Sequence, residues 1–320
     1  MSSEIPRRTI RAAVAIFAAG LSCLLGGLAN AQETAPRSPQ RTSIVPYYFP
    51  DTVGQHPSIT IANFQAWLDD QLGPATGYDL KFKYYYHFED LVTDMGQRIA
   101  AGDYPLFGAL AADVAIAYRQ AWDLDVLFLP QTSADLNTQR LAVCVRKDAN
   151  IKSLADLKGR TLMGPELWKA APANFERDVL GNALKISDLS SIVSTESSIS
   201  ALMGVYYKRA DAALVSNRVF EILRERTANI WRAMSIIHES ADLPLVVIVT
   251  FGKQNAAVRA TAVRVASRMH EDESGRKALE YVRLKRMTGA TWDSLRQLQT
   301  QTGDAHVPRA TPTPAAAPKK

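Results

Sequence analysis

Strand-like and helix-like segments alternate along nearly the whole chain, and this alternation limits its fold more than any other feature. Short apolar runs such as 141–145 (LAVCV) and 211–216 (DAALVS) are typical of buried strands. Between such runs lie segments whose apolar residues have helical spacing, most clearly in 88–99. We therefore predict an α/β fold with mostly parallel sheets and helices on their faces.

The chain holds more strand–helix units than one sheet of ordinary width accommodates, and no Pro/Gly-rich linker separates its halves. Two lobes joined by strands satisfy both observations. Ligands of such sheets lie outside the carboxyl ends of the strands, so two facing lobes would form a ligand-binding cleft between them. Residues 255–302 are expected to be almost entirely helical.

The first 31 residues form a different kind of sequence. Arg7, Arg8 and Arg11 precede an apolar stretch, 12–28, which ends at Ala29-Asn30-Ala31. This order of basic, apolar and small residues predicts a cleaved signal peptide, 1–31, and export to the periplasm. An uncleaved anchor is the alternative, although the apolar stretch is short for a membrane span.

The Pro/Ala-rich tail, 304–320, cannot build a core, so we expect it to be disordered. Removing 1–31 leaves 34 basic and 31 acidic side chains, too mild an excess of positive charge to predict nucleic-acid binding. Cys144 then has no intramolecular disulfide partner, and its place in an apolar run indicates a small buried hydrophobe.

No enzyme motif stands out. The histidines lack metal-ligand spacing, and the chain contains no P-loop, G-x-S-x-G or G-x-G-x-x-G sequence. We therefore expect a protein that is not an enzyme and needs neither a metal nor a cofactor. Some enzymes do use two-lobed folds of this class, so an enzyme is kept as a minor alternative.

Five segments of the chain carry a resemblance to a known family: 99–110, 151–164, 194–216, 239–252 and 270–298. The most characteristic of them contains IKSLADLKGRTLMG. In the same order, the five resemble segments of type II periplasmic solute-binding proteins, where a segment like IKSLADLKGRTLMG opens the second lobe. The closest resemblance is to the phosphonate-binding-protein-like branch, which includes PhnD-like, SsuA-like and transferrin-type proteins.

The resemblance implies a monomeric two-lobed receptor that closes by a hinge on a small ligand and delivers it to the membrane permease of an ABC transporter. Lobe one would comprise 42–139 plus 245–303, and lobe two would comprise 140–244. Handing the ligand to a membrane sensor kinase is an equally available role. A thiophilic oxyanion such as arsenite also stays open, because Cys144 lies in lobe two.

The loop where the relatives bind their anion departs from the family pattern. The resemblance implies a Ser-Thr-Ser-Gly-like loop opening a helix, where hydroxyls and backbone N–H groups bind a dianion. This chain has Gly164-Pro165-Glu166-Leu167-Trp168-Lys169 there, with no hydroxyl and with a carboxylate. We therefore expect a small polar or cationic organic ligand and not a bare phosphate or phosphonate.

The other candidate ligand-binding residues follow strand ends. Each also has a purely structural interpretation, such as helix capping for the serines and packing for Trp168. Lobe one would contribute a glycine that allows close approach to backbone, two tyrosines, and a histidine where relatives carry a tyrosine. The full predicted set is Tyr47, Tyr48, His87, Phe107, Gly108, Glu166, Trp168, Thr195, Glu196, Ser197, Ser216 and Asn217.

Overall fold

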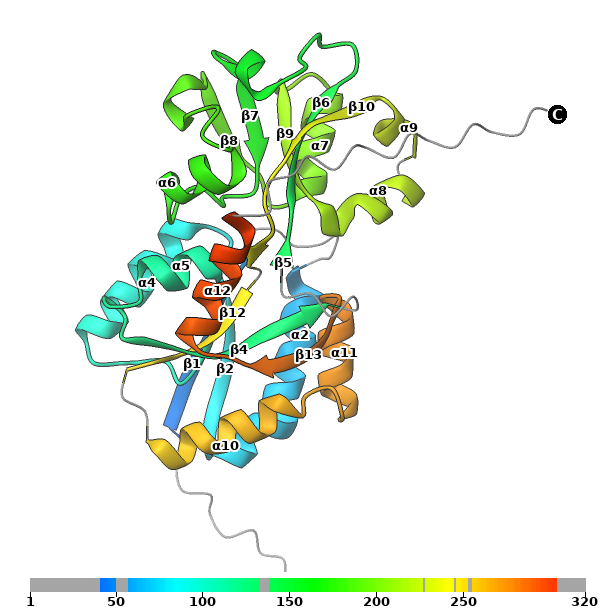
Figure 1. Ribbon diagram of the computed structural model, residues 1–320. Helices are drawn as coiled ribbons and strands as arrows, with labels where there is room; N and C mark the ends of the chain where they lie inside the picture. Colours follow the sequence, from blue (N-terminus) through cyan, green and yellow to red (C-terminus); the bar gives the residue numbers. More distant parts are fainter. Residues whose placement is uncertain are drawn as a thin grey trace, which may run out of the picture. The chain divides into compact units, whose positions relative to one another are not determined.

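The computed structural model describes residues 41–49, 57–132, 138–226, 228–244, 246–252 and 255–303 (Figure 1). The predicted signal peptide, 1–31, and the predicted tail, 304–320, lie outside these residues. Within them, no helix combines the length and apolar character that crossing a membrane requires.

The first sheet has six strands in the order β13-β4-β12-β3-β1-β2. β1 pairs in parallel with β2 and with β3, whereas β12 runs antiparallel to both β3 and β4, and β13 runs antiparallel to β4. The strands are β1 (Arg41–Tyr48), β2 (Tyr78–Tyr84), β3 (Gly108–Ala111), β4 (Leu124–Thr132), β12 (Val246–Phe251) and β13 (Leu284–Gly289).

Two hydrophobic cores cover this sheet. One joins it to α4 (Phe88–Ala100), α5 (Ala112–Ala117) and α12 (Trp292–Gly303). The other joins it to a second group of helices, and one of these, η1, is a π-helical turn. That group is α2 (Pro57–Trp67), η1 (Leu68–Leu72), α3 (Gly73–Thr76), α10 (Ala256–Ser267) and α11 (Glu273–Tyr281).

The second sheet has five strands in the order β10-β6-β9-β7-β8, and it also carries two cores. Its strands are β6 (Leu141–Arg146), β7 (Thr161–Gly164), β8 (Ser191–Ser194), β9 (Ala212–Ser216) and β10 (Met234–Glu239). Its helical elements are η2 (Leu154–Leu157), α6 (Pro172–Asn174), η3 (Phe175–Val179), η4 (Ile186–Asp188), α7 (Ser198–Tyr206), η5 (Asn217–Val219), α8 (Phe220–Arg226) and α9 (Ala228–Arg232).

A small two-stranded sheet lies in the chain between the two large ones. β5 (Thr138–Gln139) follows β4 and precedes β6, and β11 (Leu243–Pro244) follows β10 and precedes β12. The two strands pair antiparallel, Leu243 with Gln139 and Pro244 with Thr138. Both segments that connect the large sheets are therefore hydrogen-bonded to each other.

The predicted two-lobed α/β architecture is confirmed, but the prediction of mostly parallel sheets was wrong, because five of the nine strand pairs described in the two large sheets are antiparallel. Parallel strands are confined to β2-β1-β3 and β8-β7-β9, because the strands next to the crossings run antiparallel to their neighbours. The prediction of nearly continuous helix over 255–302 was wrong at β13, an edge strand whose residues lack helical spacing. Ser153 and Asp156 form a capping box that opens the 3₁₀ turn η2.

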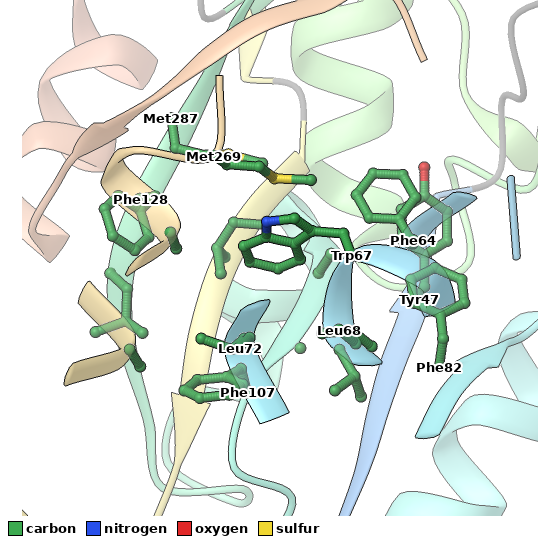
Figure 2. A pocket seen from close by; sticks show the side chains of 17 residues that line it. Tyr47, Phe64, Trp67, Leu68, Leu72, Phe82, Phe107, Phe128, Met269 and Met287 are labelled. Atoms are coloured by element: carbon green, nitrogen blue, oxygen red, sulfur yellow. The ribbon is translucent and has the colours of Figure 1, made fainter. Parts of the chain in front are cut away.

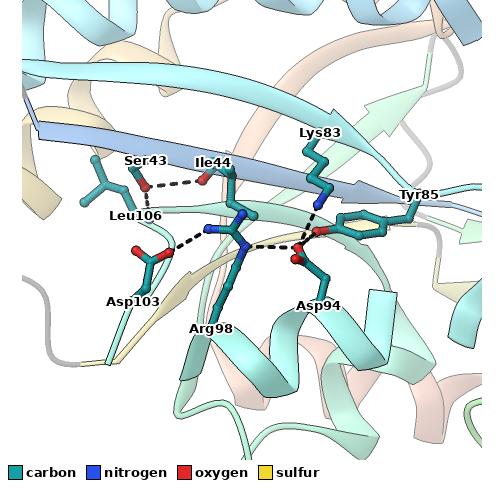
Figure 3. Close-up of polar contacts among 8 residues, drawn as sticks. All are labelled: Ser43, Ile44, Lys83, Tyr85, Asp94, Arg98, Asp103 and Leu106. Atoms are coloured by element: carbon teal, nitrogen blue, oxygen red, sulfur yellow. Dashed lines mark hydrogen bonds and ion pairs between the residues drawn. The ribbon is translucent and has the colours of Figure 1, made fainter. Parts of the chain in front are cut away.

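A carboxylate on α4 fixes this helix against β2 (Figure 3). Asp94 Oδ2 accepts hydrogen bonds from Lys83 Nζ and Arg98 Nε, both at 3.0 Å, and from the Tyr85 hydroxyl. Arg98 also donates to Asp103 at 2.6 Å. Burial alone would raise the pKa of Asp94, but these hydrogen bonds outweigh it and lower the pKa. The network ties the middle of α4 to the end of β2.

We expect Asp94→Asn to lower the free energy of unfolding at pH 7 by about 1.5–3 kcal/mol, the usual contribution of hydrogen bonds to a charged group. A carboxyl whose pKa is depressed in the folded state stabilises above its unfolded pKa of about 4, and this contribution is lost as the pH falls through the folded pKa. In urea titrations, the difference in free energy of unfolding between wild type and Asp94→Asn should therefore be smaller at pH 3 than at pH 7. Asp90→Asn, an exposed change on the same helix, is the control and should cost less than about 0.5 kcal/mol. Equal effects of the two changes would contradict this role.

Candidate ligand-binding site

The loop after β7 places a carboxylate where the strand ends. Gly164 is the last residue of β7, and a Cβ there would lie 2.7 Å from the Leu214 Cβ on β9, so only glycine allows the strands to pack this closely. Glu166 follows two residues later, with only 5% of its surface exposed. Its charge must therefore be satisfied by protein groups.

Glu166 of lobe two caps a helix of lobe one. Its Oε2 accepts a hydrogen bond of 3.0 Å from the backbone N–H of Phe88, the first residue of α4. Its Oε1 lies 2.9 Å from Lys169 Nζ and 3.4 Å from His87 Nδ1. Free N–H groups and the helix dipole make a helix N-terminus a site for anions, and here a side chain of the same protein supplies the anion.

The surrounding charges keep Glu166 ionised. Burial raises its pKa, but hydrogen bonds from the Phe88 N–H, Lys169 and Ser194 outweigh burial and lower it. Lys169 also donates to Glu89, at 2.7 and 2.8 Å, and this contact lowers the pKa of Glu89. One lysine thus bridges two carboxylates beside the α4 N-terminus.

The Tyr48 hydroxyl is a buried donor without an acceptor. The residue is 1% exposed, and its oxygen has no hydrogen-bond partner among the described residues. Burial raises the pKa of Tyr48, and the charges of Glu166 and Glu89 raise it further, so the hydroxyl keeps its proton. Buried polar groups nearly always have partners, so this hydroxyl is an exception among the described residues.

His87 lies at the exposed rim of the same cluster. Its side chain is 59% exposed, and the residue occupies the position that precedes α4 without capping it. The predicted residues Tyr48, His87 and Glu166 are thus brought together from three separate segments.

A small pocket of about 20 Å³ is lined by both lobes and carries further acidic groups. Asp113, near the start of α5, faces it from lobe one, and Asp178 faces it from lobe two. Burial, and then the charge of Asp178, raise the pKa of Asp113 to about 6, against the opposing charge of Arg177. The sequence reasoning missed this pair. The sequence does contain a signal for Asp113. It lies in the first turn of the helix that follows β3, which is the kind of position from which the other candidate residues were chosen.

Ser216 and Asn217 hold the crossing between the lobes. The Ser216 hydroxyl donates to Gln139 Oε1 at 3.1 Å, and Asn217 exchanges two hydrogen bonds with the backbone of Arg140, at 2.8 and 3.0 Å. Ser216 also caps η5 by accepting from the Arg218 N–H. Structural contacts therefore account for both predicted residues.

The hydroxyls after β8 also serve local structure. Ser197 is the N-cap of α7 and accepts from the Ser200 N–H at 3.2 Å, while the Thr195 hydroxyl donates to the Ser197 carbonyl at 3.0 Å. Glu196 between them is exposed. Trp168 is buried in the lobe-two core, with its ring edge-to-face with Phe175 at 6.0 Å.

The remaining predicted residues of lobe one lie in its interior. Phe107 and Gly108 line an apolar cavity within lobe one, together with Tyr47. Tyr47 stacks on Tyr84 with ring centroids 5.4 Å apart, and burial raises its pKa to about 12. These three residues thus surround a space different from the one beside Glu166.

Glu166→Gln should lower the free energy of unfolding at pH 7 by about 1–3 kcal/mol, because Phe88 and Lys169 lose a buried charged acceptor. The folded pKa of Glu166 is lowered, so its contribution exists above its unfolded pKa of about 4.3 and disappears as the pH falls through the folded value. Glu89→Gln, which removes the exposed partner of the same lysine, should cost less than about 1 kcal/mol. Denaturant titrations at pH 3 and 7 measure both. Equal losses for the two variants would show that Glu166 behaves as a surface residue.

Asp113→Asn should have the opposite pH dependence. A carboxyl whose pKa is raised in the folded state holds its proton there longer, so wild-type stability falls as the pH rises from about 4 to about 6. The variant should match the wild type at pH 4 and exceed it at pH 7 in urea titrations. Asp293→Asn, at an exposed ion pair with Arg296, should show no such trend. A pH-independent difference for Asp113→Asn would refute the assignment.

Comparisons with known proteins agree with this architecture. No curated protein matches the chain. Among solved structures, a binding protein component of an ABC phosphonate transporter from Pseudomonas aeruginosa superposes with a TM-score of 0.63 at 15% identity, covering 82% of this chain and 87% of that one. PhnD1 of Prochlorococcus marinus in complex with methylphosphonate superposes with a TM-score of 0.63 at 14% sequence identity, and the match covers 81% of this chain and 96% of PhnD1. A Xanthomonas citri protein bound to ATP superposes with a TM-score of 0.62 at 16% sequence identity, and the match covers 82% of this chain and 96% of that protein.

These structures share the fold of this chain, and the family itself is established from the sequence. The family described as ABC transporter, phosphonate, periplasmic substrate-binding protein matches residues 54–295, well over half of the chain. The chain therefore belongs to the family of phosphonate-type periplasmic substrate-binding proteins of ABC transporters.

Proposed function

We propose that this chain is an exported receptor that closes on a small organic ligand and delivers it to the permease of an ABC transporter. Membership of a family of periplasmic substrate-binding proteins supports this role over an enzymatic one. The basic, apolar and small residues of 1–31 support export by a cleaved signal peptide.

Closure would move two lobes about the crossings near residues 140 and 244. In this proposal lobe one is 42–139 plus 245–303 and lobe two is 140–244. Apart from Arg41 at the start of β1, the strands of each large sheet fall within these limits, and the paired strands β5 and β11 lie at the crossings. Hinges of this kind are a few terminal residues of elements that absorb the dihedral change.

The Glu166 carboxylate at the α4 N-terminus carries the proposal about ligand class. It already satisfies the Phe88 N–H, and Glu89 adds a second carboxylate nearby through Lys169. A phosphonate dianion placed there would meet the buried charge of Glu166 and the exposed charge of Glu89, and like charges brought together on binding cost several kcal/mol. We therefore assign a ligand that is polar or cationic, with an acceptor for the Tyr48 hydroxyl and a donor for Asp113 and Asp178.

The test begins with the ligand that the protein retains. Native mass spectrometry of the exported protein should detect a bound small molecule. Thermal-shift titrations should then show saturable stabilisation by that molecule or by small hydroxylated amines, and none by methylphosphonate. Asp113→Asn should weaken binding about tenfold or more, since it removes one charged contact with the ligand, while Glu271→Gln on the exposed surface should not.

Two outcomes would overturn the proposal in different ways. Tight binding of methylphosphonate would refute the ligand class but leave the receptor role intact. No retained molecule and no stabilisation across the panel would refute the receptor. Delivery is tested separately, because cells lacking this protein should take up the radiolabelled ligand more slowly.

A further inference from the structure

Lobe one contains an apolar cavity that is separate from the site beside Glu166. Its volume is about 70 Å³, and it lies between the first sheet and the helices α2 and α10. Aromatic rings and two methionines form its wall, as Figure 2 shows. All of its lining residues belong to strands, helices and loops of lobe one, so it does not depend on closure of the two lobes.

The indole of Trp67 supplies the one buried, unpaired polar group of this wall. Trp67 lies within the cavity lining in Figure 2, and it is 5% exposed. Its Nε1–H has no hydrogen-bond partner among the described residues. A buried N–H without an acceptor is unfavourable, and tryptophan N–H groups usually find a partner when buried.

The wall next to Trp67 has an unusual backbone. Leu68 and Leu72, which line the cavity, begin and end the π-helical turn η1. Gly73 follows it, and a Cβ at Gly73 would lie 2.9 Å from the Leu68 carbonyl oxygen. Single π turns are rare and are found disproportionately at functional sites. The turn sets the direction of the Trp67–Leu72 segment over the cavity.

Water is a poor occupant of this space. An ordered buried water makes two to four hydrogen bonds, whereas this wall offers one unpaired buried donor in an otherwise apolar surface. Empty apolar cavities bind small apolar molecules, and one of about 150 Å³ accepts benzene or xenon. A cavity of about half that volume suits a molecule of only a few heavy atoms.

We propose that this cavity binds a small, neutral, mainly apolar molecule that carries one hydrogen-bond acceptor, such as a short ketone or ether. The acceptor takes the Trp67 Nε1–H, and the carbon skeleton contacts Phe107, Phe128 and the flexible side chains of Met269 and Met287. The site is a second ligand site, distinct in place and in ligand chemistry from the interlobe site.

The indole proton of Trp67 reports directly on the proposed hydrogen bond. The chain has five tryptophans, so the ¹⁵N-labelled protein should show five indole cross-peaks, and Trp67→Phe identifies the one from Trp67. Acetone is the probe. Its addition should move the Trp67 proton downfield and saturably, while the other four cross-peaks stay in place. Xenon, which fills the cavity without accepting a hydrogen bond, should stabilise the protein without this downfield shift.

Two variants make the result decisive. Trp67→Phe should weaken acetone binding about fivefold, the effect of losing one neutral hydrogen bond, and leave xenon binding within about twofold. Ala266→Leu, at a lining residue of α10, should abolish both by filling the space. Small, non-saturable acetone shifts that are equal for all five indoles would overturn the proposal. So would acetone binding that survives Ala266→Leu. Neither outcome would bear on the receptor function.

Discussion

The hydrogen bond between the Phe88 N–H and the Glu166 carboxylate is the contact on which the candidate site depends. It requires β7 to pack closely on β9, which Gly164 allows, and it requires α4 to lie against β2, where the Asp94 network holds it. Lys169 then balances the buried charge and draws in Glu89. Segments far apart in the chain thus converge on one carboxylate.

This contact supports the proposal that the chain keeps the family fold but binds a ligand other than a phosphonate. A helix N-terminus with free N–H groups attracts anions of many kinds. When a glutamate of the same protein takes that place, the positive end of the helix is neutralised in advance. In the proposed function, a ligand would then meet the Tyr48 hydroxyl and the acidic pair Asp113 and Asp178, groups that do not favour an oxyanion.

The local sequence pattern predicted most of the fold, because apolar runs and the helical spacing of apolar residues depend only on residues that are close in the chain. It failed at β13, whose strand identity comes from pairing with β4, far away in sequence. The same limit applies to the site. Ser197 and Ser216 carry side chains that suit either a ligand or a helix cap, and only the partner atoms distinguish the two. Asp113 and Asp178 meet only through tertiary packing.

Cys144 has a practical consequence that differs from its role in packing. It is the only cysteine in the described part of the chain and is fully buried on β6, and burial raises its pKa to about 12, so almost none of it is thiolate at neutral pH. Maleimide dyes, which react with thiolates, will leave it untouched. A His87→Cys change at the exposed rim would then give the mature protein one labelling position beside Glu166. The protein is suited to become an optical sensor without prior removal of a native thiol.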